Sequence, residues 1–178
     1  GRLAAEWELI SERQPDLLVV LGNFSDQLDF LKASLDLNIP IFTGHALADS
    51  RLPEWLNSKL AARVRVLTAY PLIVETEHPG NKLHQQILKE YAPQLSANRW
   101  TLYGQGVAEL MVEVLQRTGR SLSRQKAVLA AEKINQWQGK LLPPVFLDSR
   151  NHLALSSFRV SQISSGKVNH LSEWIDGR

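Results

Sequence analysis

The chain has 178 residues, no cysteine and a formal net charge of +2, from 20 basic and 18 acidic residues. Its length suits one ordinary domain or two small lobes, and its 44% hydrophobic and 21% charged composition is typical of a globular protein. The charge is too small, and the basic residues are too scattered, to indicate nucleic-acid binding. The lack of cysteine excludes disulfides and thiolate metal sites. No apolar run reaches the ~18 residues of a membrane span, so we expect no direct membrane insertion.

The first residues, from Gly1 to Glu6, contain neither an initiator methionine nor the apolar centre of a signal peptide. We therefore expect a processed or cut piece of a longer protein. The compartment of that parent protein does not follow from these residues.

The first part of the chain predicts a strand–helix–strand unit after an amphipathic helix at Leu3–Arg13. The run Leu17–Leu21 is apolar without alternation, which predicts a strand buried on both faces. Ser25 is a candidate N-cap for a helix that ends near Asn38. Pro40 blocks further helix, and Ile39–Thr43 returns as a parallel strand.

The middle and end of the chain alternate in the same way. A short helix, a third strand of the same sheet and a further helix are expected at Leu52–Leu60, Val64–Ala69 and Pro79–Tyr91. The strongest helix is Trp100–Thr118, with Gly119 as its stop, and Ser123 caps the next one. Three more strands are expected at Val145–Asp148, Leu155–Ile163 and Lys167–Leu171, with a turn at 164–166. The fold class is α/β, with parallel βαβ sheet layers and flanking helices on both faces.

Two loops stand where an open α/β sheet binds ligands, at the carboxyl ends of its strands. They supply the candidate ligand-binding residues, which are Asn23, Phe24, Ser25, His45 and Ala46. The alternatives are structural: Asn23 as a turn residue, Ser25 as an N-cap only, Phe24 as core, and His45 as a loop residue without a role.

No catalytic, metal or cofactor motif competes with these loops. The chain has no Gly-x-Ser-x-Gly elbow, and Gly104-Gln-Gly106 lies inside an expected helix rather than between a strand and a helix. The spacing of His78 and His84 matches no helical metal-ligand pair. We therefore expect a protein that is not an enzyme and that uses no cofactor. Trp100 and Tyr103 are expected in the core, with a hinge or cleft wall as the alternative.

Several segments together resemble type I periplasmic binding proteins, in particular the solute receptors of branched-chain amino acid ABC transporters. The resemblance runs in order along nearly the whole chain, over Leu18–Ser25, Ile41–Gly44, Tyr103–Met111, Leu115–Gly119, Phe146–Asp148 with Asn151-His152, and Phe158–Ile163. It covers only the C-terminal half of such a receptor. It implies that residues 1–95 belong to lobe two, 96–152 to lobe one, and the tail 153–178 to lobe two again.

The resemblance implies a periplasmic solute-binding component of an ABC uptake system in a Gram-negative bacterium, which closes by a hinge around a small polar solute between two lobes and docks to a membrane permease. In the family, the loop at Asn23–Phe24 carries an aromatic residue that covers the ligand, and the loop at His45–Ala46 carries an acid that holds an ammonium group. That acid is absent here, which favours an anionic or neutral solute over an α-amino acid. A fragment of this kind should associate with itself or with the missing N-terminal half. The alternative function is a ligand-sensing domain of a signalling or regulatory protein with the same fold.

Overall fold

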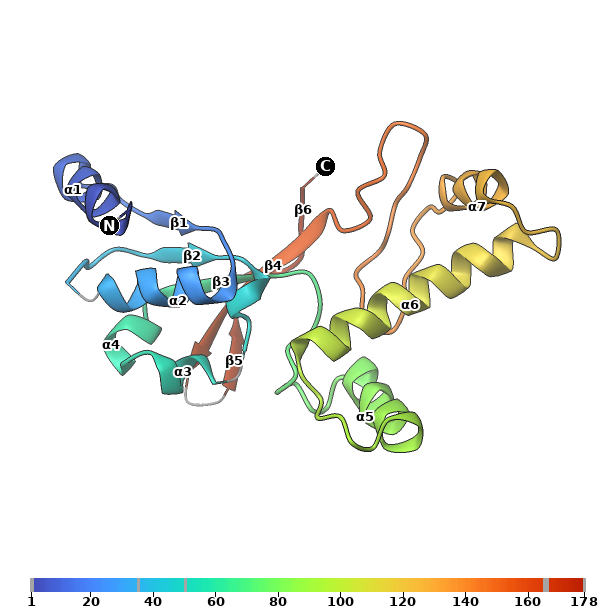
Figure 1. Ribbon diagram of the computed structural model, residues 1–178, viewed down its shortest axis with the longest axis horizontal. Coiled ribbons are helices and arrows are strands. Elements are labelled where there is room, and N and C mark those ends of the chain that lie inside the picture. Colours follow the sequence, from blue (N-terminus) through green and yellow to red (C-terminus); the bar gives the residue numbers. More distant parts are fainter. Residues whose placement is uncertain (1, 35, 50, 165–166, 178) are drawn as a thin grey trace. The chain divides into compact units, whose positions relative to one another are not determined.

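The computed structural model describes residues 2–34, 36–49, 51–164 and 167–177. The chain divides into two compact units (Figure 1). The first comprises residues 1–68 and 160–173, and the second comprises residues 69–159 and 174–178. The first boundary between these units lies after Thr68. The lobe boundaries expected near residues 95 and 152 are a separate prediction about the parent protein. The assignment of each segment to a lobe stays a prediction.

The first unit is built on three parallel strands that follow one another in sequence and in space. β1 pairs with β2, and β2 with β3, with Leu18 opposite Ile41 and Ile41 opposite Val64. This confirms the expected α/β class and its parallel βαβ core. The elements are α1 (Arg2–Arg13), β1 (Leu18–Val20), α2 (Phe24–Ala33), β2 (Ile41–Thr43), the short 3-10 helix η1 (His45–Leu47), α3 (Leu52–Trp55), α4 (Ser58–Ala61) and β3 (Val64–Thr68).

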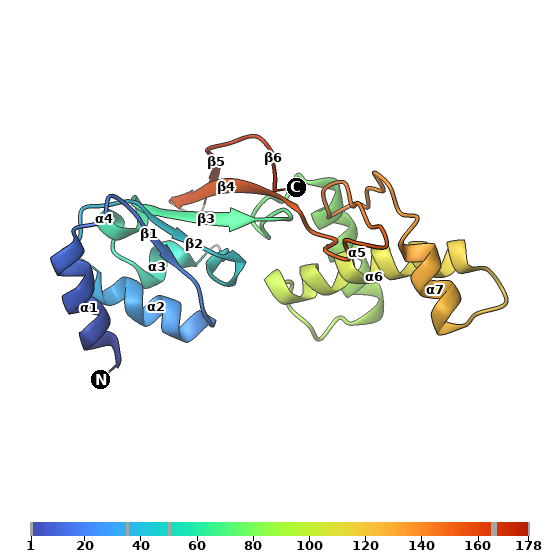
Figure 2. The same cartoon turned by 90° about the horizontal axis from the view of Figure 1, so that it is seen from above.

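The core of this unit lies on one face of the sheet. Alternate residues of β2 and β3 are fully buried, among them Ile41, Val64 and Val66. They pack with the aliphatic side chains of the helices and of η1, whose fully buried members are Leu31, Leu47, Leu52 and Leu60. In the described residues the helices gather on this face (Figure 2), so the expectation of helices on both faces is not met.

The expectation that the Leu17–Leu21 strand is buried on both faces is wrong, because β1 is exposed on one side. Val19 is 58% exposed, and Leu17 and Leu21, which flank the strand, are 48% and 73% exposed. An apolar run without alternation is typical of an interior parallel strand. Here it stands at the end of the strand order, with β2 as its neighbour.

The second unit contains the helices α5 (Pro79–Tyr91), α6 (Arg99–Thr118) and α7 (Arg124–Ala131), the start of β4 (Ser157–Ser164), and β6 (Ile175–Asp176). The end of β4 and all of β5 (Lys167–His170) belong to the first unit. β4 pairs antiparallel with β5 and, near its start, with β6. The caps expected at Gly119 and Ser123 are confirmed. The turn expected at 164–166 lies partly outside the described residues.

Two expected elements have a different form. The helix expected at Leu52–Leu60 is broken into α3 and α4, because Leu56 is extended and the side chain of Asn57 accepts from the amide of Leu60 to start a new helix. The strand expected at Val145–Asp148 is a single antiparallel bridge between Val145 and Trp137. The chain then turns, since Asp148 donates its amide to the carbonyl of Asn151 at 3.0 Å.

A chain of buried and half-buried polar side chains joins α5 to α6. His84 is 2% exposed, and its Nδ1 and Nε2 lie 2.9 Å from Gln105 Oε1 and Thr101 Oγ1. Gln105 donates onward to Glu109 at 2.7 Å, and Glu109 accepts from the amide of Lys140 at 2.7 Å. Because buried polar groups are expensive to leave unpaired, this network fixes the two helices in one register. His84 is thus a structural histidine.

The start of α5 depends on a second histidine. His78 is the N-cap residue, and its Nδ1 accepts the amide of Gly80 at 3.1 Å, which requires the neutral ring. Burial lowers the pKa of His78 and the cation of Arg159 lowers it further, against the raising effect of Glu75. Protonation therefore competes with helix capping at this position.

The aromatic residues at the start of α6 are not core residues. Trp100 is 58% exposed and Tyr103 is 40% exposed. The buried partner is Tyr70, whose ring centre lies 5.7 Å from that of Tyr103. Burial raises the pKa of Tyr70, and the neighbouring Tyr103 adds to the rise while Arg99 opposes it.

Candidate functional site

The loop after β1 is organised by Asn23. This residue is the N-cap of α2, because its Oδ1 accepts from the amide of Asp26 at 2.9 Å. The same oxygen accepts from the hydroxyl of Ser25 at 2.8 Å, and Nδ2 donates to Asp26 Oδ2 at 2.7 Å. The N-cap expected at Ser25 is therefore wrong by two residues. Ser25 is an exposed residue of the first turn instead.

Phe24 opens a short row of aromatic and charged side chains. Its ring meets Trp55 edge-on, with ring centres 5.0 Å apart. The guanidinium of Arg51 lies 4.9 Å from the centre of the Trp55 ring. Asp49 accepts from Arg51 Nε and Nη2, both at 3.1 Å, and this bond raises the pKa of Arg51.

Sequence reasoning did not single out Trp55 or Arg51. The signal that could have found them is their spacing of four residues, which places both on one side of a helical turn next to an aromatic loop. Asp49 is the first acidic residue after the His45 loop, and its carboxylate is bonded to Arg51 of this row. Its carboxylate is 9% exposed and paired, which leaves it poorly placed to meet a ligand's ammonium group.

The loop after β2 continues directly into η1. His45 and Ala46 are half-buried, and the residues that follow them, Leu47 and Ala48, belong to the core. Both ring nitrogens of His45 are shielded from solvent. The imidazole of His45 therefore lies within the protein surface rather than projecting from it.

The structure brings the two candidate loops to one edge of the sheet. Val20 and Thr43 are partners in the parallel register, so the residues that follow each strand leave the sheet side by side. Leu21 Cδ2 lies only 3.7 Å from the place of a side-chain carbon at Gly44. The loop that carries Asn23, Phe24 and Ser25 and the loop that carries His45 and Ala46 thus start at the same edge of the sheet.

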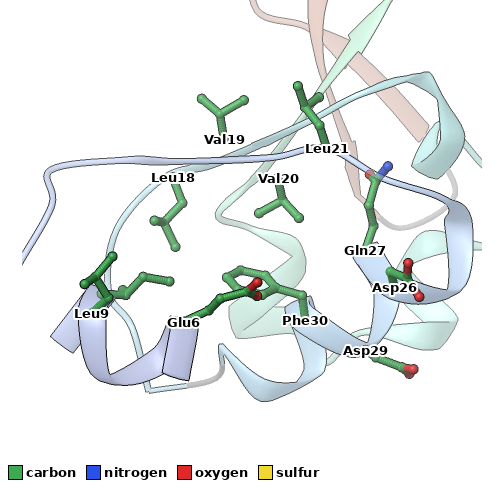
Figure 3. A pocket seen from close by; sticks show the side chains of 11 residues that line it. Glu6, Leu9, Leu18, Val19, Val20, Leu21, Asp26, Gln27, Asp29 and Phe30 are labelled. Carbon is green, nitrogen blue, oxygen red and sulfur yellow. The ribbon is translucent and has the colours of Figure 1, made fainter. Parts of the chain in front are cut away.

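Two surface hollows lie away from these five candidate residues. One of about 800 Å³ lies between α1, β1 and α2 (Figure 3), and one of about 470 Å³ lies beside α5 and α6. Neither is lined by Asn23, Phe24, Ser25, His45 or Ala46. Within the described ranges, no group of three or more His, Asp or Glu side chains is arranged to hold a metal ion. In the same part of the chain, no helix has both the length and the apolar character that crossing a membrane requires.

Comparison with solved structures identifies the fold. The chain is similar to a leucine-binding protein from Thermotoga maritima, with a TM-score of 0.71 and 16% identity over 98% of this chain and 48% of that one. It is similar to a branched-chain amino acid ABC transporter protein from Thermus thermophilus with bound valine, with a TM-score of 0.76 and 13% identity over 97% and 49% of the two chains.

This chain has the fold of a type I periplasmic binding protein. The same fold occurs in a fatty acid ABC transporter substrate-binding protein from Thermomonospora curvata, with a TM-score of 0.76 and 14% identity over 98% and 46% of the two chains. No protein-family model and no curated protein matches the sequence. The chain spans less than half of the length of these proteins. It covers 44% of a similar structure, a possible leucine/isoleucine/valine-binding protein from Rhodopirellula baltica, and 49% of the Thermus thermophilus protein. The likeness seen in the sequence is thus confirmed at the level of the fold.

Proposed function

We propose that this chain is part of the solute-binding component of an ABC-type uptake system, and that it works in the periplasm with a membrane permease. The observation that carries the proposal is the pairing of this fold with two neighbouring loops at the carboxyl edge of β1 and β2. Ligands of open α/β sheets bind at that edge. The proteins with this fold named above are described as binding proteins or transporter proteins, which supports a role that is not enzymatic and needs no cofactor.

The loops offer an aromatic face and hydrogen-bonding groups to a solute. Phe24 is the candidate cover for the ligand, held edge-on by Trp55. Asn23 has a second amide hydrogen that its bonds to Asp26 and Ser25 do not use, since those bonds take Oδ1 and one hydrogen of Nδ2. His45 and Ala46, half-buried after the adjacent strand β2, are the candidates from the second loop.

This arrangement favours a solute that accepts hydrogen bonds. The spare group of Asn23 is a donor, which suits a carboxylate or an amide oxygen. An α-amino acid would need a fixed negative charge to offset desolvation of its ammonium group. The nearest candidates are already engaged, Asp26 by Asn23 and Asp49 by Arg51. We therefore propose an anionic or neutral polar solute.

The test is calorimetry on the full-length protein with leucine, valine and a panel of simple carboxylates and amides. Asn23→Ser keeps a helix-capping oxygen but removes the amide donor, so binding should weaken while folding is kept. Asn57→Ser is the matched control, because Asn57 caps α4 in the same way, with its Oδ1 accepting from the amide of Leu60 at 2.8 Å.

The proposal expects carboxylate or amide binding that Asn23→Ser weakens and Asn57→Ser leaves unchanged. His45→Ala should weaken it as well. Tight leucine binding that survives Asp49→Ala would show that the argument against amino acids is wrong. Equal binding by Asn23→Ser and Asn57→Ser would remove the β1 loop from the site.

A further inference from the structure

The smaller of the two surface hollows, the α5–α6 groove, lies away from the candidate ligand loops. It has a volume of about 470 Å³ and is bounded by α5, by α6 and by residues 137–140. All three segments belong to the second unit, in which α5 lies beside α6 (Figure 1). The apolar part of its wall is formed by Leu83, Ile87, Ala108, Val112 and Trp137. Small-molecule sites typically have volumes of about 300–1,000 Å³ and mostly apolar linings, so this groove suits a small ligand.

Glu109 is an acidic residue of the α5–α6 groove, and neutral groups hold its carboxylate in place. Its Oε1 accepts from Gln105 Nε2 at 2.7 Å, and its Oε2 accepts from the backbone amide of Lys140 at 2.7 Å. Gln105 is itself bonded to the buried His84. In the part of the chain that the structure describes, no lysine, arginine or histidine side chain forms an ion pair with Glu109. The groove therefore presents a positioned negative charge without a cation from those residues.

Gly139 allows this carboxylate to lie close to the aromatic part of the wall. A side-chain carbon added at Gly139 would lie 2.5 Å from Glu109 Oε2 and 2.9 Å from Trp137 Cη2. The carboxylate and the indole ring thus reach the same point of the backbone, where a larger residue would displace one of them. A ligand in the groove meets a negative charge and an apolar surface within the length of one small molecule.

These two features specify the chemistry of the ligand. The carboxylate of Glu109 is on a half-buried residue, and a cation that pairs with it offsets the cost of its lost hydration. An apolar body gains free energy by leaving water for the walls. An amphiphilic anion would instead bring a like charge to Glu109. Lys140 also lines the groove, but it is exposed, so water screens the attraction of its ammonium group for an anion.

We propose that the α5–α6 groove is a binding site for a small amphiphilic cation. The ligand is an alkyl or aromatic amine whose protonated nitrogen pairs with Glu109 and whose apolar body lies against Val112 and Trp137. The groove belongs to the second unit, whereas the candidate ligand loops belong to the first. The site is therefore additional to those loops and does not depend on the proposed function.

The test is calorimetry on the full 178-residue chain at pH 7 and low salt, with octylammonium, octanol and octanoate as ligands of one chain length. Glu109→Gln removes the charge and keeps an acceptor oxygen. Its matched control is Glu113→Gln, because Glu113 lies one turn further along α6 and pairs with Arg117 at 2.6 Å. Val112→Ser makes one wall polar. Its control is Val107→Ser, because the two valines are 52% and 45% exposed on α6 and, of the two, Val112 lines the groove.

The proposal expects octylammonium to bind at least about tenfold more tightly than octanol or octanoate. Glu109→Gln should weaken octylammonium binding about tenfold, and Glu113→Gln should change it less than about twofold. Val112→Ser should weaken it as well, and Val107→Ser should not. Preference for octanoate, equal losses in the two glutamine variants, or no binding of octylammonium would overturn the proposal. The comparison of the three ligands on the unaltered chain decides the question where Glu109→Gln fails to fold.

Discussion

Gly80 occupies a position at the start of α5 that leaves no room for a side chain. A carbon added there would lie 2.5 Å from Leu141 Cδ2 and 2.5 Å from the carbonyl oxygen of Lys140. The leucine side chain can rotate, but the backbone carbonyl cannot move without its chain. Overpacking of this kind costs about 1–3 kcal/mol, and the higher helix propensity of alanine offsets at most about 1 kcal/mol.

We therefore expect Gly80→Ala to lower the free energy of unfolding by about 1–2 kcal/mol, or roughly 2–8 °C in Tm. Gly104 provides the matched control, because no atom lies within 4 Å of a carbon added there. Gly104→Ala should stabilise α6 by about 0.5–1 kcal/mol. Gly106→Ala should fall between the two, since its carbon would meet the movable Leu142 Cδ2 at 2.9 Å.

The assay is urea unfolding followed by circular dichroism, with the slope compared among the three variants. Equal slopes show that the variants unfold from similar native states, so their midpoints report stability. The reasoning fails if Gly80→Ala is as stable as Gly104→Ala. It also fails if Gly106→Ala is the least stable of the three.

Two histidines give further predictions. His84→Ala should destabilise the chain by about 2–4 kcal/mol in urea unfolding, because it removes a buried side chain and leaves the buried amide oxygen of Gln105 without its partner, whereas the exposed His152→Ala should stay within about 0.5 kcal/mol. A small effect at His84 would contradict the buried network. His78 has a pKa that burial lowers in the folded state, so the unfolded chain binds more protons as pH falls through 6.5. Stability should therefore decrease from pH 7 downward and level off below the folded pKa, and His78→Asp, which keeps an acceptor for Gly80, should lose this dependence. An unchanged pH profile for His78→Asp would show that His78 is not the group that causes the pH dependence.

Elements whose signals are local could be predicted from the sequence. α6 begins after Asn98, whose side chain accepts from the amides of Trp100 and Thr101, and the broad apolar face of the helix identifies it. β1, α2 and β2 were predicted from one strand run, one apolar stripe and one proline. These features depend on residues within a few positions of one another, so their signals can be read from the sequence without knowledge of distant contacts.

Other features depend on contacts that a sequence does not display. Asn23 and Ser25 are both good N-cap residues, and the choice follows from the geometry that brings Asp26 to Asn23. The aromatic row joins Phe24 to Trp55 across two elements. The exposure of β1 could not be predicted either, because an apolar run indicates what a strand needs to contact and not whether the contact is present.

The open edge and the candidate ligand loop share a strand, which links assembly to binding. The exposed run Leu17–Leu21 forms the outer edge at β1, and Asn23 of the candidate ligand loop follows two residues later. In the described residues, β1 has hydrogen-bonded neighbours on one side only, so the position of its carboxyl end depends on β2 and on the capping of α2. A strand paired to the outer edge would restrain Leu21 and thereby the loop that follows. A loop ordered before binding loses less conformational entropy when a solute arrives. Solute affinity should therefore increase with completion of the sheet, even where the added strand contacts no ligand.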